Sequence, residues 1–567
     1  MKKILLVLFV FSFSLCEGQS WLWAKEEVNH QNGDSSLVDP EDLTTDNLGN
    51  IYETGNFGGK VSFGTINFYS PQFLTSGFLV KFDNSGTPLW GIAESTQDYA
   101  DGISVATGKN NNVCLTGNYI DTMVIGSFTF PNNGFGMFFT AMFSSSGSFI
   151  WGSYSKPGGV DGGTIGPQAV KIDNWGNTYE TGYFYDTVEV GSIPMYAPNN
   201  ISFFLIKYDA FGTPLWIKTS ANNGYMTGNS LVTDSNGNVY VEGDFSGNVT
   251  IGSNSLSSTN GNIFVAKFDS TGNVLWITSP NLSSANSYAY SSGSSGDRVC
   301  KAIAIDPAEN LYVTGNFHDT VIFGTENLSD SMGIYLVKYS SLGNVIWAKK
   351  SAPLHDLPYF PQPWSIACDN TNGVYLSGTF YGSINFSGLT VLSDSAEPSF
   401  LYKFDTSGAV LCGSAINNNN DDNNCVAADP LSNSVFFSGD IDIPFDSEGC
   451  YFGSYYLTGI GLEYGFLAKW TCDIEEGTNK ISSLDYSISL FPNPSTGIFT
   501  FQSSVVSNQL SVEVYNVLGE KVYSSNYSLS TNHHSLNLSD QPNGIYLYRV
   551  LNADGSLLGE GKMIIQK

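Results

Sequence analysis

A unit of about 60 residues recurs along most of this chain, and the repetition limits the possible fold more than any other feature. Each unit has four short runs of β-branched and aromatic residues separated by polar turn residues, as in residues 303–347. A Gly closes the second run and recurs as Gly55, Gly117, Gly182, Gly243, Gly315, Gly378 and Gly439. One small four-stranded sheet cannot bury both of its faces alone. The repetition therefore predicts an all-β fold of packed sheets.

The runs of one unit are divided between the two ends of the repeat region. A Trp opens the fourth run at Trp90, Trp151, Trp216, Trp276 and Trp347, and Cys412 takes its place in the sixth unit. The seventh unit stops after its third run, at residues 466–470, whereas residues 20–25 match the fourth-run pattern of residues 345–349. An N-terminal strand that completes the last sheet would remove exposed sheet edges. We therefore predict a seven-bladed β-propeller over residues 19–472, closed by its N-terminal strand.

Residues 1–18 have the pattern of a secretory signal peptide. Lys2 and Lys3 precede an apolar run over residues 4–15, and small or polar residues follow it. The run is too short for a transmembrane helix, and no other segment is long and apolar enough to span a membrane. Cys16 raises the alternative of a lipoprotein. On either interpretation, we expect an exported protein.

The charge balance argues against anionic partners. The chain has 23 Lys and Arg against 52 Asp and Glu, a formal net charge of −29. Without Lys2, Lys3 and Glu17 of the expected signal peptide, 21 basic and 51 acidic residues give −30. Such a surface repels phosphate backbones and anionic lipid. We expect no nucleic-acid partner, and we expect a monomer.

Seven cysteines follow the expected signal peptide, and their number is odd. Export permits disulfides, and the closest pairs in sequence are Cys412 with Cys425 and Cys450 with Cys472. Burial as small apolar residues is the alternative, notably for Cys114 and Cys368. The connectivity stays open. No Cys-x-x-Cys and no Cys/His cluster indicates zinc.

The repeat ends near residue 472, and the composition then changes. Residues 473–486 have the polar composition of a linker. Residues 487–567 contain about seven short strand-like runs separated by Pro, Asn and Gly turns. This spacing predicts a small β-sandwich domain.

Parts of the sequence resemble two known families. Residues 173–184 and 234–245 share Asp-x-x-Gly-Asn-x-Tyr-x-x-Gly-x-Phe, and residues 207–216 and 267–276 share Lys-Tyr/Phe-Asp-x-x-Gly-x-x-x-Trp. This unit resembles the β-propeller repeats (SBBP-like) of exported bacterial proteins. The resemblance implies a propeller scaffold and no fixed activity.

The tail resembles the type A sorting domain of type IX secretion in Bacteroidota. Residues 491–497, 514–522, 536–546 and 561–567 match its motifs in order. The motif residues are Pro492, Asn493, Pro494, Gly497, Gly519, Gly544, Tyr546 and Lys562. The resemblance implies that the domain addresses the protein to the outer-membrane translocon and the sorting machinery. The resemblance therefore implies that the protein is secreted or attached to the cell surface.

In a propeller, function is expected on the face where the loops vary in length. The longest variable segments are residues 153–167, 279–298 and 351–364. Candidate ligand-binding residues are His355, Asp356, Tyr359, Phe360 and Trp364, together with Tyr288 and Tyr290. The alternative is that these aromatic side chains cap the blade they precede. The Lys and Asp residues that recur in most units are expected to be structural.

Two oxygen-rich segments are candidates for Ca²⁺, although a solvated turn is the alternative for each. Their residues are Asp421, Asp422, Asp440 and Asp442. No other cofactor is expected. A sialidase is excluded because Arg298 and Arg549 are the only arginines and Arg549 lies in the tail. Paired carboxylates for glycoside hydrolysis stay open among so many acidic residues.

The chain therefore has two candidate functions. The first is a noncatalytic surface or secreted propeller that binds or adheres to a glycan or protein. The second is an extracellular glycan-active hydrolase or lyase on the same scaffold. The lack of a recognisable acid/base or nucleophile motif favours the first.

Overall fold

The computed structural model describes residues 19–26, 37–71, 74–96, 98–132, 136–158, 163–222, 224–291, 301–353, 361–393, 398–416, 424–442, 450–457, 463–472, 488–491, 495–503, 510–516, 520–527, 533–552 and 557–567. The chain divides into two compact units, Met1–Ile474 and Glu475–Lys567. The named elements of the described residues are all strands. This observation confirms the predicted all-β fold. The expected signal peptide, residues 1–18, lies outside the described residues.

Unit 1 repeats one order of four antiparallel strands. In repeat 1 these are β2 (Leu37–Thr45), β3 (Ile51–Gly58), β6 (Thr75–Phe82) and β7 (Pro88–Ala93), hydrogen-bonded in this order. Repeat 2 has β8 (Ala100–Thr107), β9 (Val113–Tyr119), β12 (Met137–Phe143) and β13 (Phe149–Pro157). Repeat 3 has β14 (Thr164–Ile172), β15 (Thr178–Val190), β16 (Ile193–Tyr208) and β17 (Pro214–Asn222). Repeat 4 has β19 (Ser230–Thr233), β20 (Val239–Ile251), β21 (Asn254–Phe268) and β22 (Val274–Thr278), with β18 (Tyr225–Met226) also paired to β20.

The order continues in the second half of unit 1. Repeat 5 has β25 (Ile303–Ile305), β26 (Leu311–Phe323), β27 (Glu326–Tyr339) and β28 (Val345–Pro353), and β23 (Asn281–Leu282) and β24 (Tyr288–Tyr290) also pair with β26. Repeat 6 has β29 (Gln362–Cys368), β30 (Val374–Thr379), β33 (Ser399–Phe404) and β34 (Val410–Ile416). Repeat 7 has β35 (Cys425–Ala428), β36 (Ser434–Asp442) and β39 (Glu463–Cys472). Its fourth strand is β1 (Gln19–Glu26), which pairs with β39 from Gln19 opposite Cys472 to Glu26 opposite Phe466.

Short hairpins extend the connection between the second and third strands. They are β4 (Lys60–Phe63) with β5 (Ile66–Tyr69), β10 (Met123–Ile125) with β11 (Phe128–Phe130), β31 (Ser383–Phe386) with β32 (Leu389–Leu392), and β37 (Cys450–Phe452) with β38 (Tyr455–Leu457). In repeats 3, 4 and 5 the strands themselves run on into this hairpin. The end of one repeat pairs with the hairpin of the next, for example β13 with β15 and β28 with β31. These pairings merge neighbouring repeats into larger sheets.

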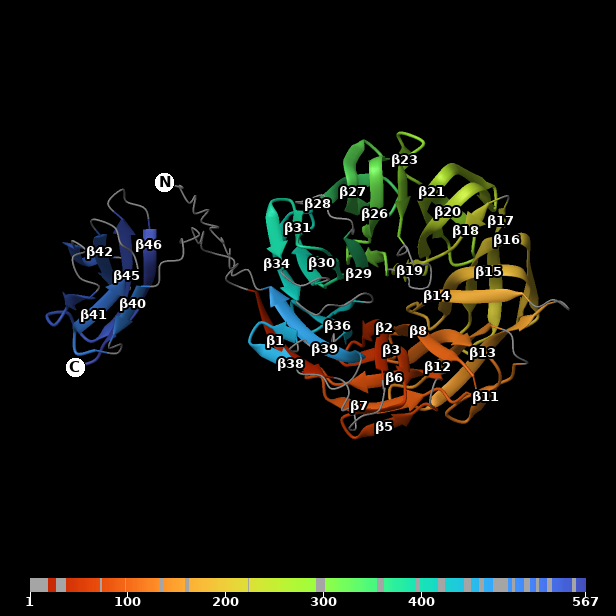
Figure 1. Cartoon of the computed structure of the whole chain (residues 1–567), viewed down its shortest axis with the longest axis horizontal. Coiled ribbons are helices and arrows are strands. Elements are labelled where there is room, and N and C mark those ends of the chain that lie inside the picture. Colours follow the sequence, from red (N-terminus) through yellow and green to blue (C-terminus); the bar gives the residue numbers. More distant parts are fainter. Residues whose placement is uncertain are drawn as a thin grey trace, which may run out of the picture. The chain divides into compact units, whose positions relative to one another are not determined.

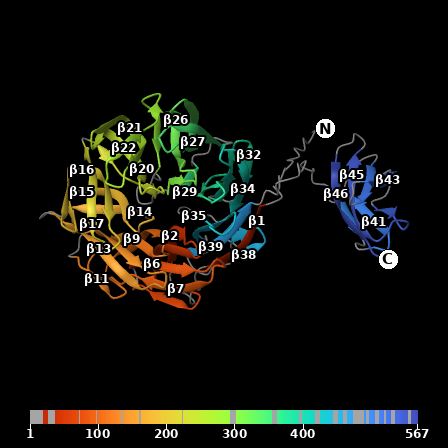
Figure 2. The same cartoon turned by 180° about the vertical axis from the view of Figure 1, so that it is seen from behind.

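The first strands of the repeats meet around a common centre. They contact one another in the order β2, β8, β14, β19, β25, β29 and β35, and β35 also contacts β2. Figures 1 and 2 show the repeats of unit 1 arranged around this centre. Lys301 reaches across it, since its Nζ donates to the carbonyls of Ile103 (3.2 Å) and Gln168 (3.0 Å) and lies 3.6 Å from Asp42. The arrangement is propeller-like.

The recurring Gly is explained by the close approach of two strands. A Cβ on Gly55 would lie 2.1 Å from the carbonyl oxygen of Asp39, and one on Gly117 would lie 1.8 Å from that of Asp101. The same holds for Gly182, Gly243, Gly315 and Gly378, at distances up to 2.4 Å from a carbonyl oxygen. No side chain fits at such distances. These glycines are therefore structural.

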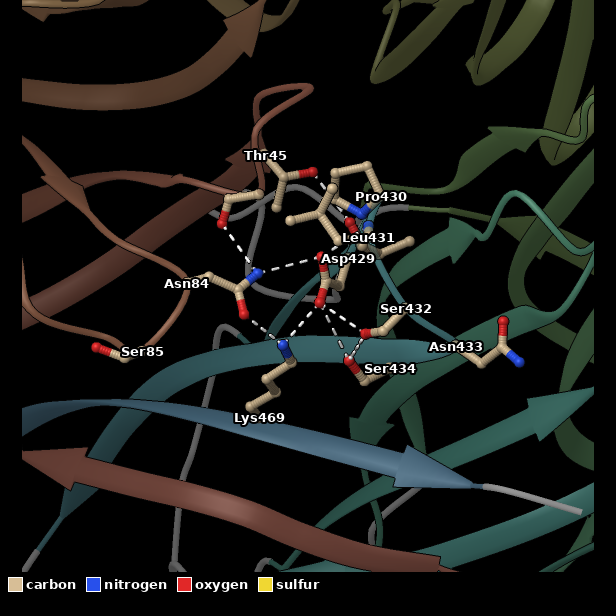
Figure 3. Close-up of polar contacts among 12 residues, drawn as sticks. Thr45, Asn84, Ser85, Asp429, Pro430, Leu431, Ser432, Asn433, Ser434 and Lys469 are labelled. Atoms are coloured by element: carbon tan, nitrogen blue, oxygen red, sulfur yellow. Dashed lines mark hydrogen bonds and ion pairs between the residues drawn. The ribbon is translucent and has the colours of Figure 1, made fainter.

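The recurring Lys and Asp also have a structural role. The pairs Lys81 with Asp46, Lys267 with Asp234, Lys338 with Asp306, Lys403 with Asp369 and Lys469 with Asp429 have Nζ to Oδ2 distances of 2.6–3.7 Å. Figure 3 shows the last pair, where Lys469 also donates to Asn84 Oδ1 of repeat 1 at 2.7 Å. The Asn84 amide in turn donates to Asp429 at 3.2 Å. This triad links repeat 7 to repeat 1.

Unit 2 is built from two sheets. One contains β40 (Ile488–Phe491), β41 (Ile498–Ser503) and β44 (His533–Asn537). The other contains β43 (Lys521–Tyr527), β42 (Leu510–Asn516), β45 (Gly544–Asn552) and β46 (Leu557–Ile565). Side chains of both sheets share one apolar core, which includes Phe499, Val514, Leu536 and Tyr548.

Candidate functional site

An open hollow lies where repeats 4 and 5 of unit 1 meet. Its volume is about 620 Å³, and its lining residues are Asn260, Gly261, Ala285, Asn286, Tyr288 and His318. Asn260 belongs to β21 of repeat 4, and His318 belongs to β26 of repeat 5. The connection between the two repeats supplies the other side. Ala285, Asn286 and Tyr288 lie in the variable segment 279–298, whereas Asn260, Gly261 and His318 lie outside the variable segments.

Stacked rings form one wall of the hollow. Tyr288 on β24 lies opposite His318 on β26, and the two rings are nearly parallel, 4.9 Å apart at an interplanar angle of 8°. Tyr290 stacks against Tyr288 at 5.7 Å. His318 Nδ1 lies 3.2 Å from the carbonyl oxygen of Asn286. Because a carbonyl only accepts, a neutral His318 carries its proton on Nδ1 and leaves Nε2 as an acceptor.

Hydrogen bonds hold the connection that forms the hollow. The Asn260 amide donates to the carbonyls of Ala285 (2.5 Å) and Ser287 (3.1 Å). Ser284 and Ser287 donate to Asp319 Oδ2 at 2.8 and 3.3 Å. These bonds tie residues 284–288 to both neighbouring repeats. Ligand contacts made there would need little reordering of the chain.

Sequence reasoning placed part of this site. Of the two candidate tyrosines, Tyr288 lines the hollow and Tyr290 stacks against it. His318 was missed because it follows Tyr288 by 30 residues and only strand pairing brings the two side chains close. Trp364 lies on β29 with 4% of its surface exposed, and its indole N–H donates to Thr379 at 3.2 Å. This buried position fits the alternative that the aromatic side chain caps its blade. His355, Asp356, Tyr359 and Phe360 lie outside the described residues.

A second group of functional interest joins repeats 1 and 2. Glu94 is 3% exposed, and neither of its carboxylate oxygens has a hydrogen-bond partner among the described residues. Burial, together with the nearby charge of Asp101, holds the pKa of Glu94 well above its usual range. Burial also raises the pKa of Asp101 to about 6, although Asp101 accepts hydrogen bonds from the Tyr99 hydroxyl and the backbone N–H of Asn118. Glu94 and Asp101 are therefore a pair of buried carboxyl groups.

The Ca²⁺ candidates do not form a cluster in the described part of the chain. Asp440, on β36, is 4% exposed, and Asp442 ends the same strand. Asp421 and Asp422 lie outside the described residues. No group of three or more His, Cys, Asp and Glu suited to a metal ion occurs among the residues described.

The sorting motifs fall on unit 2. Tyr546 is 5% exposed on β45, and its hydroxyl donates to the Pro542 carbonyl at 2.9 Å. Gly497 has a φ of +111°, a conformation that favours Gly, while Gly544 begins β45 and the exposed Lys562 lies on β46. Pro492, Asn493, Pro494 and Gly519 lie outside the described residues.

One disulfide pairs differently from the nearest neighbours in sequence. Cys412 bonds Cys472, 60 residues away, with a Cα to Cα distance of 6.4 Å. Cys425 and Cys450 are free and buried, as is Cys114. Proximity in sequence was therefore a wrong guide, because β34 and the end of β39 meet only in the folded chain.

The C-terminal tail matches a known protein family. Residues 489–566 match the family described as "Secretion system C-terminal sorting domain". This chain carries a sorting domain. The match confirms that the tail is a secretion sorting domain and indicates export by type IX secretion, to the cell surface or beyond it. Interaction with the secretion machinery follows.

Other similarities are weaker. An uncharacterised WD repeat-containing protein of Acanthamoeba polyphaga mimivirus is 25% identical over 410 residues, 59% of this chain and 29% of that protein. The match thus spans less than a third of that relative. Among solved structures, a fungal alcohol oxidase in complex with copper has a TM-score of 0.37 at 12% identity, over 97% of this chain and 100% of its own. The structure of YCF48 bound to D1 peptide has a TM-score of 0.33 at 11% identity, over 81% of this chain and 100% of its own. Similarity this low transfers no activity.

The described residues include no helix long and apolar enough to cross a membrane.

Proposed function

We propose that this chain is an exported, noncatalytic β-propeller that binds a glycan or protein ligand at the cell surface or outside the cell. The hollow of Tyr288, His318, Asn260 and Asn286 carries the proposal. Aromatic faces with a few convergent amide and imidazole groups are typical of ligand sites. No carboxylate lies among the lining residues. The lining therefore offers contacts for binding and lacks the pair of carboxylates that glycoside hydrolysis commonly uses.

The proposed scaffold is a closed seven-bladed ring over residues 19–472, in a bacterium of the Bacteroidota. Contacts between β35 and β2, and the pairing of β1 with β39, support closure. A signal peptide over residues 1–18 would carry the chain to the periplasm before type IX secretion. Residues 473–486 would link the ring to the sorting domain, and the mature protein would be a monomer.

Glycan binding is tested with the purified full chain on a glycan array, followed by mass analysis of each bound glycan. Tyr288→Ala and His318→Ala should weaken binding about tenfold, the effect of losing one aromatic contact. Tyr69→Ala is the matched control, because Tyr69 is 65% exposed on the hairpin of repeat 1. A fully retained array signal in Tyr288→Ala would reject this hollow as the site.

The alternative is a glycan-active hydrolase or lyase. Such chemistry needs an acid and a base beside the scissile bond. The raised pKa values of Glu94 and Asp101 favour it, yet both residues are buried, Glu94 in the connection between repeats 1 and 2 and Asp101 on β8. Cleavage products in the mass analysis would overturn the binding role, and their loss in Glu94→Gln would assign the chemistry to this pair.

A further inference from the structure

The hairpin of repeat 7 differs from those of the other repeats at one pair of positions. In repeats 1 to 6 the residues that face each other there are Ser62 and Asn67, Val124 and Thr129, Glu189 and Pro194, Thr250 and Ser255, Ile322 and Asn327, and Asn385 and Thr390. None of these is aromatic. In repeat 7 the pair is Tyr451 and Tyr456. A difference confined to one repeat is the type of feature that function adds to a common scaffold.

The two tyrosines face outward. Tyr451 is 56% exposed and Tyr456 is 41% exposed, and their ring centroids are 4.5 Å apart at an interplanar angle of 36°. Their neighbours on the hairpin point inward, since Cys450 and Phe452 are fully buried and Leu457 is 6% exposed. This alternation is that of strands with one buried face. The exposed rings are therefore not core residues.

The N-terminal strand holds the hairpin in place. Phe452 packs edge-on against Trp21 of β1, with ring centroids 4.9 Å apart. The Tyr455 hydroxyl donates to the carbonyl of Leu22 on the same strand, and Phe452 also packs against Phe466 of β39 at 4.8 Å. The pair thus rests on a packed layer. A ligand that stacks on it would find the rings already ordered.

We propose that Tyr451 and Tyr456 form a platform for the apolar ring face of a neutral sugar in a polysaccharide. A tyrosine combines an apolar ring with a polar tip, which matches the C–H face and the hydroxyl edge of a pyranose. Residues 450–457 contain no charged side chain, although the chain carries a net charge of −29. An uncharged ligand is consistent with this composition.

The size of the patch favours a sugar over a protein. Of the described residues of the hairpin and of β1, the exposed large apolar side chains are Tyr451, Tyr456 and Leu22. A stable protein interface needs about 1,000 Å² of well-packed surface. Three side chains supply far less, but they suit one or two sugar rings. The platform is separate from the hollow of repeats 4 and 5, and it does not depend on that site.

The test is native gel electrophoresis of the full chain in gels containing mixed-linkage β-glucan, xyloglucan or galactomannan. At least one of these neutral polysaccharides should retard the protein. Tyr451→Ser should weaken the retardation about tenfold, whereas Tyr451→Trp should preserve it. Tyr196→Ser is the matched control, because Tyr196 is a 68% exposed tyrosine on the hairpin of repeat 3. Unchanged near-ultraviolet circular dichroism would show that each variant is folded.

Two results would overturn the platform. One is the absence of retardation of the wild-type chain by all three polysaccharides. The other is equal retardation of Tyr451→Ser and the wild type. Tyr288→Ala separates the two sites: its retardation should equal that of the wild type if the platform binds. Retardation lost in Tyr288→Ala and kept in Tyr451→Ser would assign the sugar to the hollow instead.

Discussion

At the scale of single residues, buried carboxyl groups connect neighbouring repeats. Glu180 of β15 is fully buried and contacts hydroxyls of Thr116 and Thr140 in repeat 2 and of Tyr208 in its own repeat. Thr116 also donates to the Phe139 carbonyl at 2.8 Å, as the corresponding Thr of repeats 1, 3 and 5 does to its own carbonyl. A hydroxyl has one proton. The Thr116 hydroxyl therefore shares its proton between the Phe139 carbonyl and Glu180 Oε1.

A pH-dependent stability follows from this carboxyl group. Burial raises the pKa of Glu180 to about 7 from an ordinary value of 4.5, against the opposing effect of its hydroxyl donors. The stabilising contribution is complete below pH 4.5 and is lost as the pH rises through 7, because the folded state must then bury a charge. In urea unfolding at pH 4.5, 6 and 8, the advantage of wild type over Glu180→Gln should shrink as the pH rises.

Other acids also titrate in this range, so the comparison uses the difference between variant and wild type. Glu326→Gln is the matched control, because Glu326 is exposed. Its difference from wild type should be constant with pH. A constant difference for Glu180→Gln as well would contradict a raised pKa.

At the scale of elements, the disulfide occupies the place of a contact that four of the other repeats make. The indole N–H groups of Trp90, Trp216, Trp276 and Trp347 donate to a carbonyl in the turn between the third and fourth strands of the next repeat, at 3.0–3.3 Å. Repeat 7 has no such turn, since its fourth strand comes from the N-terminus. In repeat 6 the Trp position is Cys412, which bonds the end of β39.

Loss of this bond should weaken the junction of repeats 6 and 7. Cys412→Ser with Cys472→Ser is expected to lower the free energy of unfolding by about 2–4 kcal/mol, in the usual range for a native disulfide. Urea unfolding measures the change. Reductant should destabilise the wild type to the same extent and leave the double variant unaffected. Equal stability of wild type and variant in the absence of reductant would show that the bond contributes nothing.

At the scale of the whole molecule, the two units should unfold independently, because each has its own apolar core. A chain that ends at Ile474 should keep the melting temperature of unit 1, measured by calorimetry. The full chain should add a second transition for unit 2. A lower melting temperature in the shortened chain would show that unit 1 needs its tail.

Repetition made the fold predictable from the sequence, because Gly, Trp, Lys and Asp each meet a local structural requirement that recurs in most repeats. Gly117 makes room for a carbonyl, and Lys469 neutralises Asp429. Contacts that occur only once could not be predicted from the sequence. His318 contacts Tyr288 through strand pairing, Cys412 bonds Cys472 of the next repeat, and Glu180 contacts Thr116 of the preceding repeat. No local pattern encodes such distant partners.

The pairing of β1 with β39 also has a consequence for the order of folding. Gln19 meets Cys472 only after every repeat between them has been made, and bringing such distant segments together is slow. Until then β39 presents an open edge, where another chain could pair. The first described strand of the chain is thus the last to find its place. A molecule stalled before that step would be the species most prone to aggregate or to exchange strands with a second copy.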